Sequence, residues 1–478
     1  MEQWSSRLGF LLAAIGSAVG IGNIWRFSSV VGQNGGGAYL IPYLLAVFVC
    51  GVPLLALEMA AGRHYRGDVV TVFHTVRDRF RIIGWLICVI VFLILSYYLV
   101  ITGWTLAYLC FAATGSAVSF DGFTGSPLPL LFFIVSALAT GGIISLGVRG
   151  GIERITTILL PLIYLILGVM VVYAVTLPGF NEGIAYFLTP DFSVLGDPGI
   201  WSAAVGQAFF SLSVGYGILI TYGAYMDRGI RIGRSSLIIA AADTLASMLA
   251  GLVIFPLVFT FGLEPSMGAQ LAFTTLPRAF ALMPFGRAFA VAFFFLLFAA
   301  ALTSAISMLE VGVASVEGST GLSRRRVTLL LTGLVILIGL PSALSYTGIA
   351  LSVGGIRILD LLDETVGTMA LPVTALLIAV VFTWYAGRGL LEKEMGSEPG
   401  WLKVVYPVTK YLAPAVLGFI TMARIVYALD FPGWHLLPGI PYIGILLQGS
   451  TTVILLSVLV LVAALLCGLT GCRRPDRE

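Results

Sequence analysis

The chain contains twelve apolar segments, each long enough to cross a lipid bilayer as a helix of about 20 residues. They lie near residues 8–32, 38–62, 84–112, 128–147, 154–177, 200–226, 234–262, 287–316, 327–345, 360–386, 403–428 and 445–468. Only 10% of the residues are charged and 59% are hydrophobic, whereas soluble proteins carry about 25% charged residues. The sequence therefore predicts an all-α integral membrane protein with about twelve transmembrane helices and no soluble domain.

Lysine and arginine residues are distributed unevenly among the loops that join these segments. With the N-terminus inside, the cytoplasmic segments hold 20 of them and the outer loops hold only Arg278, Arg287 and Arg357. Because cytoplasmic loops are enriched in basic residues, we expect both termini of this multi-pass protein in the cytoplasm. The chain has no Asn-x-Ser/Thr sequon, which is typical of a prokaryotic plasma (inner) membrane protein. A net charge of +3 gives no reason to expect a nucleic acid partner, and no obligatory protein partner is evident.

Glycines interrupt two of the twelve segments. The first segment contains GSAVGIGN at residues 16–23, and the sixth contains VGYG at residues 214–217. Glycine costs about 1 kcal/mol per residue against alanine in a helix, and non-helical backbone inside a bilayer is tolerated only where it lines a cavity or is covered by protein. Two such helices at matching positions of two halves indicate an inverted-repeat transporter, with its binding site at the repeat interface.

The spacing of the two interrupted segments divides the chain into repeats. We expect residues 1–178 to form the first repeat, residues 199–386 the inverted second repeat, and residues 400–470 two peripheral helices. At the breaks, freed carbonyl groups could coordinate a dehydrated cation, and the N-termini of the half-helices could present N–H groups to an anion. The structural alternative is that the glycines only allow close helix packing.

Longer stretches of the chain resemble one transporter family. RLGFLLAAIGSAVGIGNIWRF and NGGGAYLIPY resemble the first two helices of the neurotransmitter:sodium symporter family, and SYYLVITGW, GQAFFSLSVGYG and ALTSAISMLE resemble its third, sixth and eighth helices. The similarity covers nearly the whole chain. It implies the fold of the bacterial leucine transporter, with ten helices in two inverted repeats and two peripheral helices. It also implies sodium-driven uptake of amino acids or related amines by alternating access.

The resemblance also implies two sodium sites. The first would consist of Ala18, Asn23, Ser211 and Asp243 with the substrate carboxylate as a further ligand, and the second of Gly16, Val19, Ala300, Thr303 and Ser304. These positions supply carbonyl, amide, hydroxyl and carboxylate oxygens, the ligands that a hard cation prefers. Without the resemblance, two adjacent hydroxyl residues in a buried helix would be taken as bonded back to their own helix.

The substrate site implied by the resemblance surrounds the first break. The substrate carboxylate would meet N–H groups around Gly20 and Gly22 and the hydroxyl of Tyr98, beside Ala18. Members that transport amines carry aspartate at the position of Gly20, so glycine favours an amino acid. The side-chain pocket would be lined by Ile94, Phe210, Ser213, Tyr216, Ser304 and Met308. Since this lining carries no charged group, desolvation would exclude charged side chains, and we expect a neutral, apolar or aromatic substrate.

Arg26 lies just beyond the first break, and a charge inside the membrane is a functional candidate by default. We expect it to pair with Asp363 as the outer gate, with Phe210 as a lid below them. The alternative is that Arg26 extends to the outer interface.

On the inner side, Trp4 and Arg7 match the N-terminal latch of the family, although its usual arginine is absent because that position is Met1. Glu58 is expected to accept hydrogen bonds from the unwound first helix, and Glu310 has no role that the sequence assigns. Gly151 and Pro161 resemble the family's glycine–nine–proline motif, which would unwind the fifth helix; a plain helix start with a packing proline is the alternative.

The chloride pocket of chloride-dependent members corresponds to Tyr43, Gln207, Ser211, Asp243 and Ser247. Those members carry asparagine at the fourth position. Asp243 brings the negative charge itself, so we expect no chloride requirement.

Two other functions remain as alternatives, a sodium-gated amino-acid sensor or channel on the same scaffold and a membrane-embedded enzyme. The enzyme would need a catalytic dyad or a metal cluster, and none of the His, Cys or Ser spacings supplies one.

Overall fold

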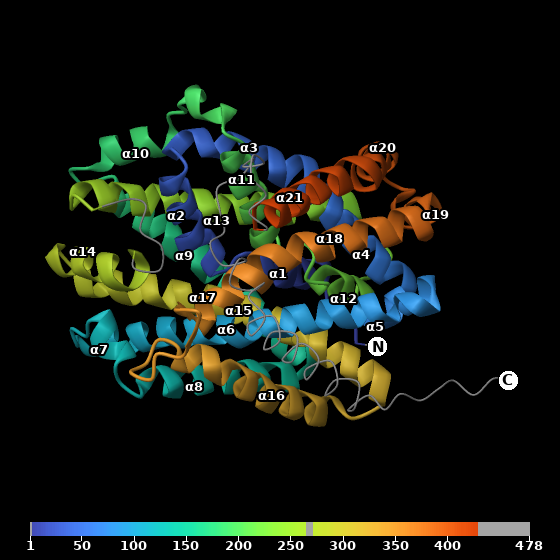
Figure 1. Ribbon diagram of the computed structural model, residues 1–478, viewed down its shortest axis with the longest axis horizontal. Helices are drawn as coiled ribbons and strands as arrows, with labels where there is room; N and C mark the ends of the chain where they lie inside the picture. Colours follow the sequence, from blue (N-terminus) through green and yellow to red (C-terminus); the bar gives the residue numbers. More distant parts are fainter. Residues whose placement is uncertain (1, 264–270, 429–478) are drawn as a thin grey trace.

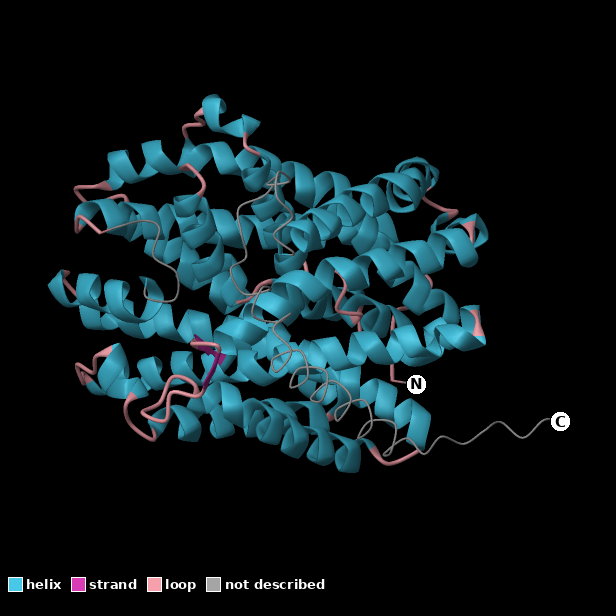
Figure 2. Cartoon of the chain, viewed as in Figure 1, coloured by secondary structure: helices cyan, strands magenta, loops and turns pink. Residues whose placement is uncertain are grey.

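The structure is a computed structural model that describes residues 2–263 and 271–428 (Figure 1). Nearly all of it is helix, as Figure 2 shows, because backbone N–H and C=O groups inside a bilayer must be paired within the chain. In the described part, two strands, β1 (Ser352–Val353) and β2 (Ile356–Arg357), form a short antiparallel hairpin. Ser352 lies opposite Arg357 and Val353 opposite Ile356.

The first ten helices are α1 (Arg7–Ala18), α2 (Phe27–Gln33), α3 (Leu40–Leu45), α4 (Val52–Tyr65), α5 (Val69–Val76), α6 (Arg81–Thr114), α7 (Phe120–Thr124), α8 (Leu128–Ser145), α9 (Arg154–Ala174) and α10 (Phe180–Leu188). The next eleven are α11 (Pro198–Ser211), α12 (Ile218–Ala224), α13 (Ile232–Thr260), α14 (Leu276–Leu282), α15 (Gly286–Thr320), α16 (Arg324–Leu344), α17 (Ile358–Leu362), α18 (Leu371–Val380), α19 (Arg388–Met395), α20 (Pro399–Pro407) and α21 (Ala413–Ala428). Short 3-10 turns lie at Gly36–Tyr39, Asp78–Phe80 and Phe192–Gly196, and wider π turns at Gly22–Arg26, Ala46–Gly51, Val148–Glu153, Leu271–Thr275, Asp363–Ala370, Val381–Tyr385 and Val408–Leu412.

Two long helices, α6 and α15, form the centre of the bundle. In Asp78–Thr114, 78% of an apolar stretch of 18 residues is buried inside the structure. The corresponding share is 67% in Gly286–Thr320 and only 28% in Val148–Ala174. These two helices pack along each other, and α1 packs against α15 and α9 in the interior (Figure 1). Peripheral helices keep large apolar side chains exposed, such as Leu165 and Val172 on α9, as a surface facing lipid would.

The helices agree with most of the expected membrane spans. Within the described residues, nine helices are long and apolar enough to cross a membrane, and the bent pair Arg7–Ala18 and Gly22–Gln33 would make ten. They coincide with expected segments one to five and seven to eleven. The sixth is present as α11 and α12, and the twelfth, residues 445–468, lies outside the described residues. The grouping into repeats at 1–178 and 199–386, with peripheral residues 400–470, stays a prediction.

The first break lies where the glycines predicted it. Helix α1 ends at Ala18, Val19 is extended with φ −70° and ψ 104°, and helix resumes at Gly22. The two halves are bent by 53°. A bend of this size leaves the backbone between the halves free to pair with groups outside the helix.

The second break is longer and more strained. Helix α11 ends at Ser211 and α12 begins only at Ile218. Gly215 and Gly217 adopt φ of 91° and 70°, which glycine does at no steric cost. Ser213 also has a positive φ of 55°, a conformation rare for residues with a side chain. Its hydroxyl donates to the carbonyl of Ser17 at 2.9 Å, so this contact joins the two breaks directly.

Candidate functional site

Four oxygen atoms converge on one point between the two breaks. The amide nitrogen Nδ2 of Asn23 lies 2.6 Å from Asp243 Oδ1, 3.1 Å from the Asp243 carbonyl, 2.9 Å from Ser211 Oγ and 3.0 Å from Ser247 Oγ. Ser211 also donates to both carboxylate oxygens of Asp243, at 3.0 and 2.8 Å. All four side chains are buried. The arrangement surrounds a single donor with oxygens, as a small cation would be surrounded.

The orientation of the Asn23 amide differs from what a sodium ligand requires. Its oxygen Oδ1 accepts the N–H of Gly20 at 2.8 Å, and its nitrogen faces Asp243. The structure therefore brings Asn23, Ser211 and Asp243 together, but it points the amide oxygen of Asn23 at the broken backbone. Ala18 lines the same cavity as Ser211.

A second set of oxygens lies where α1 meets α15. Thr303 Oγ1 donates to the Ala300 carbonyl at 3.0 Å. Ser304 Oγ lies 3.2 Å from the Ala300 carbonyl and 3.5 Å from the Val19 carbonyl. Gly16 completes the group, because a β-carbon there would lie 3.5 Å from Thr303 Cβ. The five positions predicted for a second cation are thus neighbours in space.

A cavity lies between the two sets of oxygens. Its lining is Ser17, Ala18, Gly20, Gly22, Tyr98, Phe210, Ser211, Ser213, Tyr216, Ile218, Ser304 and Met308. Nine of the ten predicted substrate residues are in this lining. Ile94 is fully buried on α6 one turn before Tyr98 and is not part of it. Sequence reasoning missed Ser17 and Ile218, although both adjoin the glycine-rich stretches that marked the breaks.

The freed backbone groups around the cavity find specific partners. The N–H of Ile21 donates to the Tyr98 hydroxyl at 3.4 Å, and the Gly22 carbonyl accepts from Gln207 Nε2 at 3.0 Å. Glu58 accepts the N–H of Gly215 at 2.8 Å. The expectation that Glu58 supports the first broken helix is therefore wrong, because it supports the second. These contacts replace the hydrogen bonds that the broken helices lack, as buried backbone requires.

The outer side of the cavity is closed by Phe210 and Arg26. The Arg26 guanidinium lies 4.2 Å from the centroid of the Phe210 ring, and one nitrogen donates to Thr368 Oγ1 at 3.2 Å. Asp363 instead accepts the Tyr97 hydroxyl at 2.9 Å. The expected direct ion pair between Arg26 and Asp363 is not present in the described structure. Both residues line a further cavity of about 110 Å³.

The predicted anion-pocket residues are all buried around Asp243. Tyr43 is fully buried on α3, whose neighbour α11 carries Gln207. In the described structure the Tyr43 hydroxyl and Gln207 Oε1 have no hydrogen-bond partner. Ser247 Oγ lies 3.3 Å from the Asp243 carbonyl. The only carboxylate among these five residues is that of Asp243.

At the inner end, Trp4 is buried against α12. Its Nε1 donates to the Tyr222 carbonyl at 3.0 Å, and its ring centroid lies 5.1 Å from that of Tyr222. Arg7 is exposed and forms no ion pair within the described residues. Trp4 therefore contacts the second broken helix, as expected for a latch.

Glu310, which the sequence left unassigned, forms a buried ion pair at this end. Its carboxylate lies 2.5 and 3.1 Å from the guanidinium nitrogens of Arg324 and accepts the Tyr225 hydroxyl at 2.9 Å. One turn along both helices, the Tyr222 hydroxyl donates to Ser307 at 2.8 Å. Tyr222 on α12 and Tyr225 directly after it therefore hold this helix against α15.

The predicted motif in the fifth segment is helical throughout. Gly151 lies in the π turn Val148–Glu153, which leads directly into α9. Pro161 lies inside α9, which continues to Ala174. No unwinding is present between these two residues.

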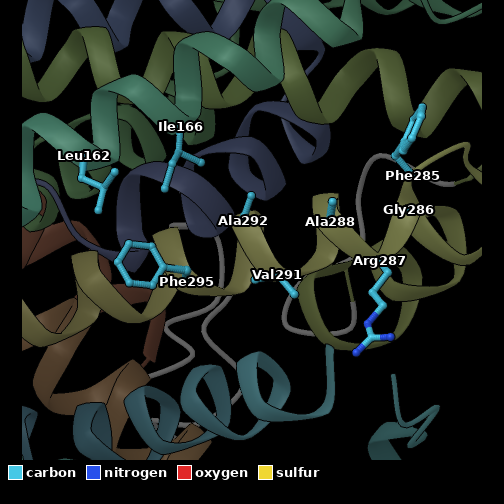
Figure 3. Close-up of a pocket in the computed structure, with 9 residues that line it drawn as sticks. All are labelled: Leu162, Ile166, Phe285, Gly286, Arg287, Ala288, Val291, Ala292 and Phe295. Atoms are coloured by element: carbon cyan, nitrogen blue, oxygen red, sulfur yellow. The ribbon is translucent and has the colours of Figure 1, made fainter. Parts of the chain in front are cut away.

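A much larger cavity lies outside this site. Figure 3 shows it between α9, which contributes Leu162 and Ile166, and the start of α15. Its volume is about 800 Å³ and its lining is almost wholly apolar. Arg287 points away from Ile166 in Figure 3 and donates to the carbonyls of Ala112 and Ala113 at the end of α6. Among the residues that line it in the described structure, Arg287 alone has a polar side chain, so the smaller central cavity is the better candidate for a zwitterion.

Comparisons with known proteins agree on one family. The profile of the sodium:neurotransmitter symporter family matches residues 1–120 and 128–466. The uncharacterised sodium-dependent transporter YhdH of Bacillus subtilis (strain 168) is 35% identical over 413 residues, covering 83% of this chain and 91% of that protein. The uncharacterised sodium-dependent transporter MJ1319 of Methanocaldococcus jannaschii is 34% identical over 428 residues, covering 83% of this chain and 84% of that protein.

A solved structure shows the same fold. The crystal structure of MhsT in complex with L-phenylalanine matches with a TM-score of 0.83 at 39% sequence identity. The match covers 88% of this chain and 99% of that one.

Proposed function

Because this chain belongs to the sodium:neurotransmitter symporter family and is a sodium-dependent transporter rather than an enzyme, we propose that it imports a neutral, apolar or aromatic amino acid with sodium. Transport would proceed by alternating access across a plasma membrane, with both termini in the cytoplasm. The observation that carries this proposal is the pair of broken helices whose free backbone and buried oxygens enclose one cavity.

The first sodium ion would bind where the four oxygens now surround Asn23 Nδ2. The donor set suits Na⁺, because Asp243 supplies a charge and Ser211 a hydroxyl oxygen. Rotation of the Asn23 amide would turn Oδ1 toward the ion and release the N–H of Gly20. That N–H would then be free for the substrate carboxylate. Sodium binding would in this way prepare the substrate site, which is a physical basis for coupled uptake.

The second sodium ion would bind between the carbonyls of Gly16, Val19 and Ala300 and the hydroxyls of Thr303 and Ser304. In the structure these hydroxyls donate to carbonyls of the same group. A cation would be coordinated by the carbonyl and hydroxyl oxygens together. It would link α1 to α15 across the first break.

The substrate side chain would lie against Phe210, Tyr216 and Met308. These residues are apolar or aromatic, and none of the described residues that line the cavity is charged. Burying a charge there without a partner would be costly. MhsT, whose structure contains L-phenylalanine, supports an amino acid with a large neutral side chain. A flexible methionine could adapt to aliphatic and aromatic substrates alike.

Closure of the outer gate should depend on Arg26. Arg26→Ala is expected to slow transport about tenfold, a barrier increase of about 1.4 kcal/mol, while substrate affinity changes less than threefold. Arg26 packs on Phe210 and lines the outer cavity together with Asp363, so its loss leaves the substrate contacts in place but weakens the closing lid. Equilibrium binding and uptake by the same purified variant separate the two effects. Normal uptake by Arg26→Ala would remove Arg26 from the gate, and Arg357→Ala serves as a control at an arginine outside this cavity.

The proposal is tested with purified protein in proteoliposomes under an inward sodium gradient. Radiolabelled leucine, phenylalanine, tryptophan, aspartate and lysine are compared, with choline replacing Na⁺ in parallel. We expect uptake of at least one of the three neutral amino acids, no uptake of aspartate or lysine, and none in choline. Uptake of lysine or aspartate at a comparable rate would contradict the assignment of the cavity.

A further inference from the structure

An aromatic band lies beside α18, α20 and α21, which are neighbours in Figure 1. It consists of Trp384, Tyr385, Tyr406 and Tyr411, all of them exposed except the half-buried Tyr406. Trp384 and Tyr385 end the apolar span Ile358–Tyr385, and their turn contacts the one that carries Tyr411. Tryptophan and tyrosine gather where a membrane meets water, so the band marks the level of the lipid headgroups.

Lys410 lies within this band, inside the apolar span Pro399–Met422. Its carbonyl accepts the indole N–H of Trp384 at 2.9 Å, which places it level with the end of the neighbouring span. Its ammonium group donates to the Tyr406 hydroxyl at 2.9 Å. The same nitrogen lies 5.1 and 5.3 Å from the ring centroids of Tyr406 and Tyr411. Two aromatic rings therefore hold a positive charge at the level of the headgroups.

The aromatic band carries more positive than negative charge in the part of the chain that the structure describes. Lys410 forms none of the ion pairs there. Arg77, whose guanidinium lies 4.7 Å from the centroid of the Tyr385 ring, forms none of them either. Arg388 also lies near the band, but it is paired with Glu392 at 2.7 Å. Two basic side chains are thus left for an anion from outside these residues.

Lys410 and Tyr406 can offer hydrogen-bond donors to such an anion. An ammonium group has three N–H groups, and Lys410 gives one of them to Tyr406. The Tyr406 hydroxyl accepts that bond, so its own O–H can donate to another group. Phosphate oxygens accept charge-assisted hydrogen bonds of this kind. The same span exposes Val404, Leu412 and Phe419, which form an apolar surface suited to acyl chains.

We propose that Lys410 and Tyr406 bind the phosphate of an anionic phospholipid, whose acyl chains lie along the exposed apolar side chains of the same span. A zwitterionic lipid would bring its own cation to a surface where Lys410 and Arg77 already lack partners, whereas an anionic lipid supplies the missing negative charge. None of these residues lines the central cavity or belongs to the proposed sodium sites. The inference therefore stands apart from the proposed function.

The test uses the full-length protein in detergent with equal amounts of phosphatidylglycerol and phosphatidylcholine that carry the same acyl chains. Native mass spectrometry measures how often each lipid is the first one retained. We expect the parent to retain phosphatidylglycerol about tenfold more often than phosphatidylcholine. Lys410→Met keeps an apolar stem but loses the charge. It is expected to lower this preference about fivefold, because one basic residue at a membrane surface contributes about 1 kcal/mol.

Three further variants identify the contacts. Lys410→Arg keeps the charge and should retain most of the preference for phosphatidylglycerol. Tyr406→Phe keeps the ring but loses the hydroxyl, and it should lower the preference by a smaller factor. Lys403→Met removes an exposed lysine from the same span and should behave as the parent. If Lys410→Met does not fold, Tyr406→Phe decides.

Three outcomes would overturn the inference. The first is equal retention of the two lipids by the parent. The second is a preference that Lys410→Met and Tyr406→Phe leave unchanged, because the lipid would then bind elsewhere. The third is an equal loss of preference in Lys410→Met and Lys403→Met, which would reflect net charge rather than a site. None of these measurements requires transport, so they leave the proposed function to its own test.

Discussion

Replacing Asp243 with asparagine is expected to slow chloride-free uptake roughly a hundredfold, which corresponds to about 2.7 kcal/mol. The parent protein should transport at the same rate when gluconate replaces chloride. Added chloride should restore part of the activity of Asp243→Asn, because the anion can supply the charge that the variant has lost.

The reason is the balance of charge inside the bundle. Asp243 is fully buried and is bonded to Asn23 and Ser211. Two sodium ions and one zwitterionic substrate would leave excess positive charge beside it. At an effective dielectric constant of ~20, charges ~4 Å apart interact by roughly 4 kcal/mol. Asparagine keeps the shape of the side chain and one acceptor, so the decrease in uptake rate measures the contribution of the negative charge.

Uptake in gluconate and in chloride by both proteins gives the comparison, and Asp121→Asn, at an exposed position of α7, is the matched control. A parent that stops transporting without chloride would contradict the proposed counter-charge. Full chloride-free activity of Asp243→Asn would show that the carboxylate is not needed.

Removing both hydroxyls of the second sodium site should have a comparably large effect. Thr303→Ala combined with Ser304→Ala is expected to raise the sodium concentration for half-maximal uptake at least a hundredfold. Contacts of a polar group with a charge contribute roughly 1.5–3 kcal/mol each, and the two hydroxyls provide two of the five proposed ligands. Both side chains lie within 3.2 Å of the Ala300 carbonyl, so the variant removes ligands without opening a large cavity.

Sodium-dependent binding and uptake measure this change, and the single variants should each give part of it. Ser315→Ala is the control on the same helix, because the hydrogen bond of its hydroxyl in the described structure is with Cys88 Sγ, at 3.3 Å, away from the proposed ligands. Sodium affinity equal to that of the parent in the double variant would place the second site elsewhere.

More of the fold than of the detailed site geometry could be predicted from the sequence. The glycines at residues 16–22 and 214–217 predicted both breaks, because few other residues allow helices to stop inside a bilayer. The apolar segments predicted the spans because a helix needs about 20 apolar residues to cross a bilayer. These features depend on local chain chemistry, which a single sequence contains.

Side-chain partners depend on geometry that the sequence does not contain. Arg26 and Asp363 have opposite charges, yet Asp363 bonds to Tyr97 and Arg26 packs on Phe210. Glu58 was assigned to the wrong broken helix, since either half could have offered N–H groups. The contact between Glu310 and Tyr225 could not be foreseen because the two residues lie 85 positions apart in the chain.

The most direct test of the account is whether the protein concentrates its substrate at the expense of a sodium gradient. Proteoliposomes with sodium outside and choline inside are given the neutral amino acid that the uptake comparison identifies, and the internal concentration is followed with time. We predict accumulation above the external concentration, which a sodium ionophore abolishes by dissipating the gradient. Entry that stops at the external concentration, or binding without entry, would contradict symport and would favour a channel or a sensor on the same fold.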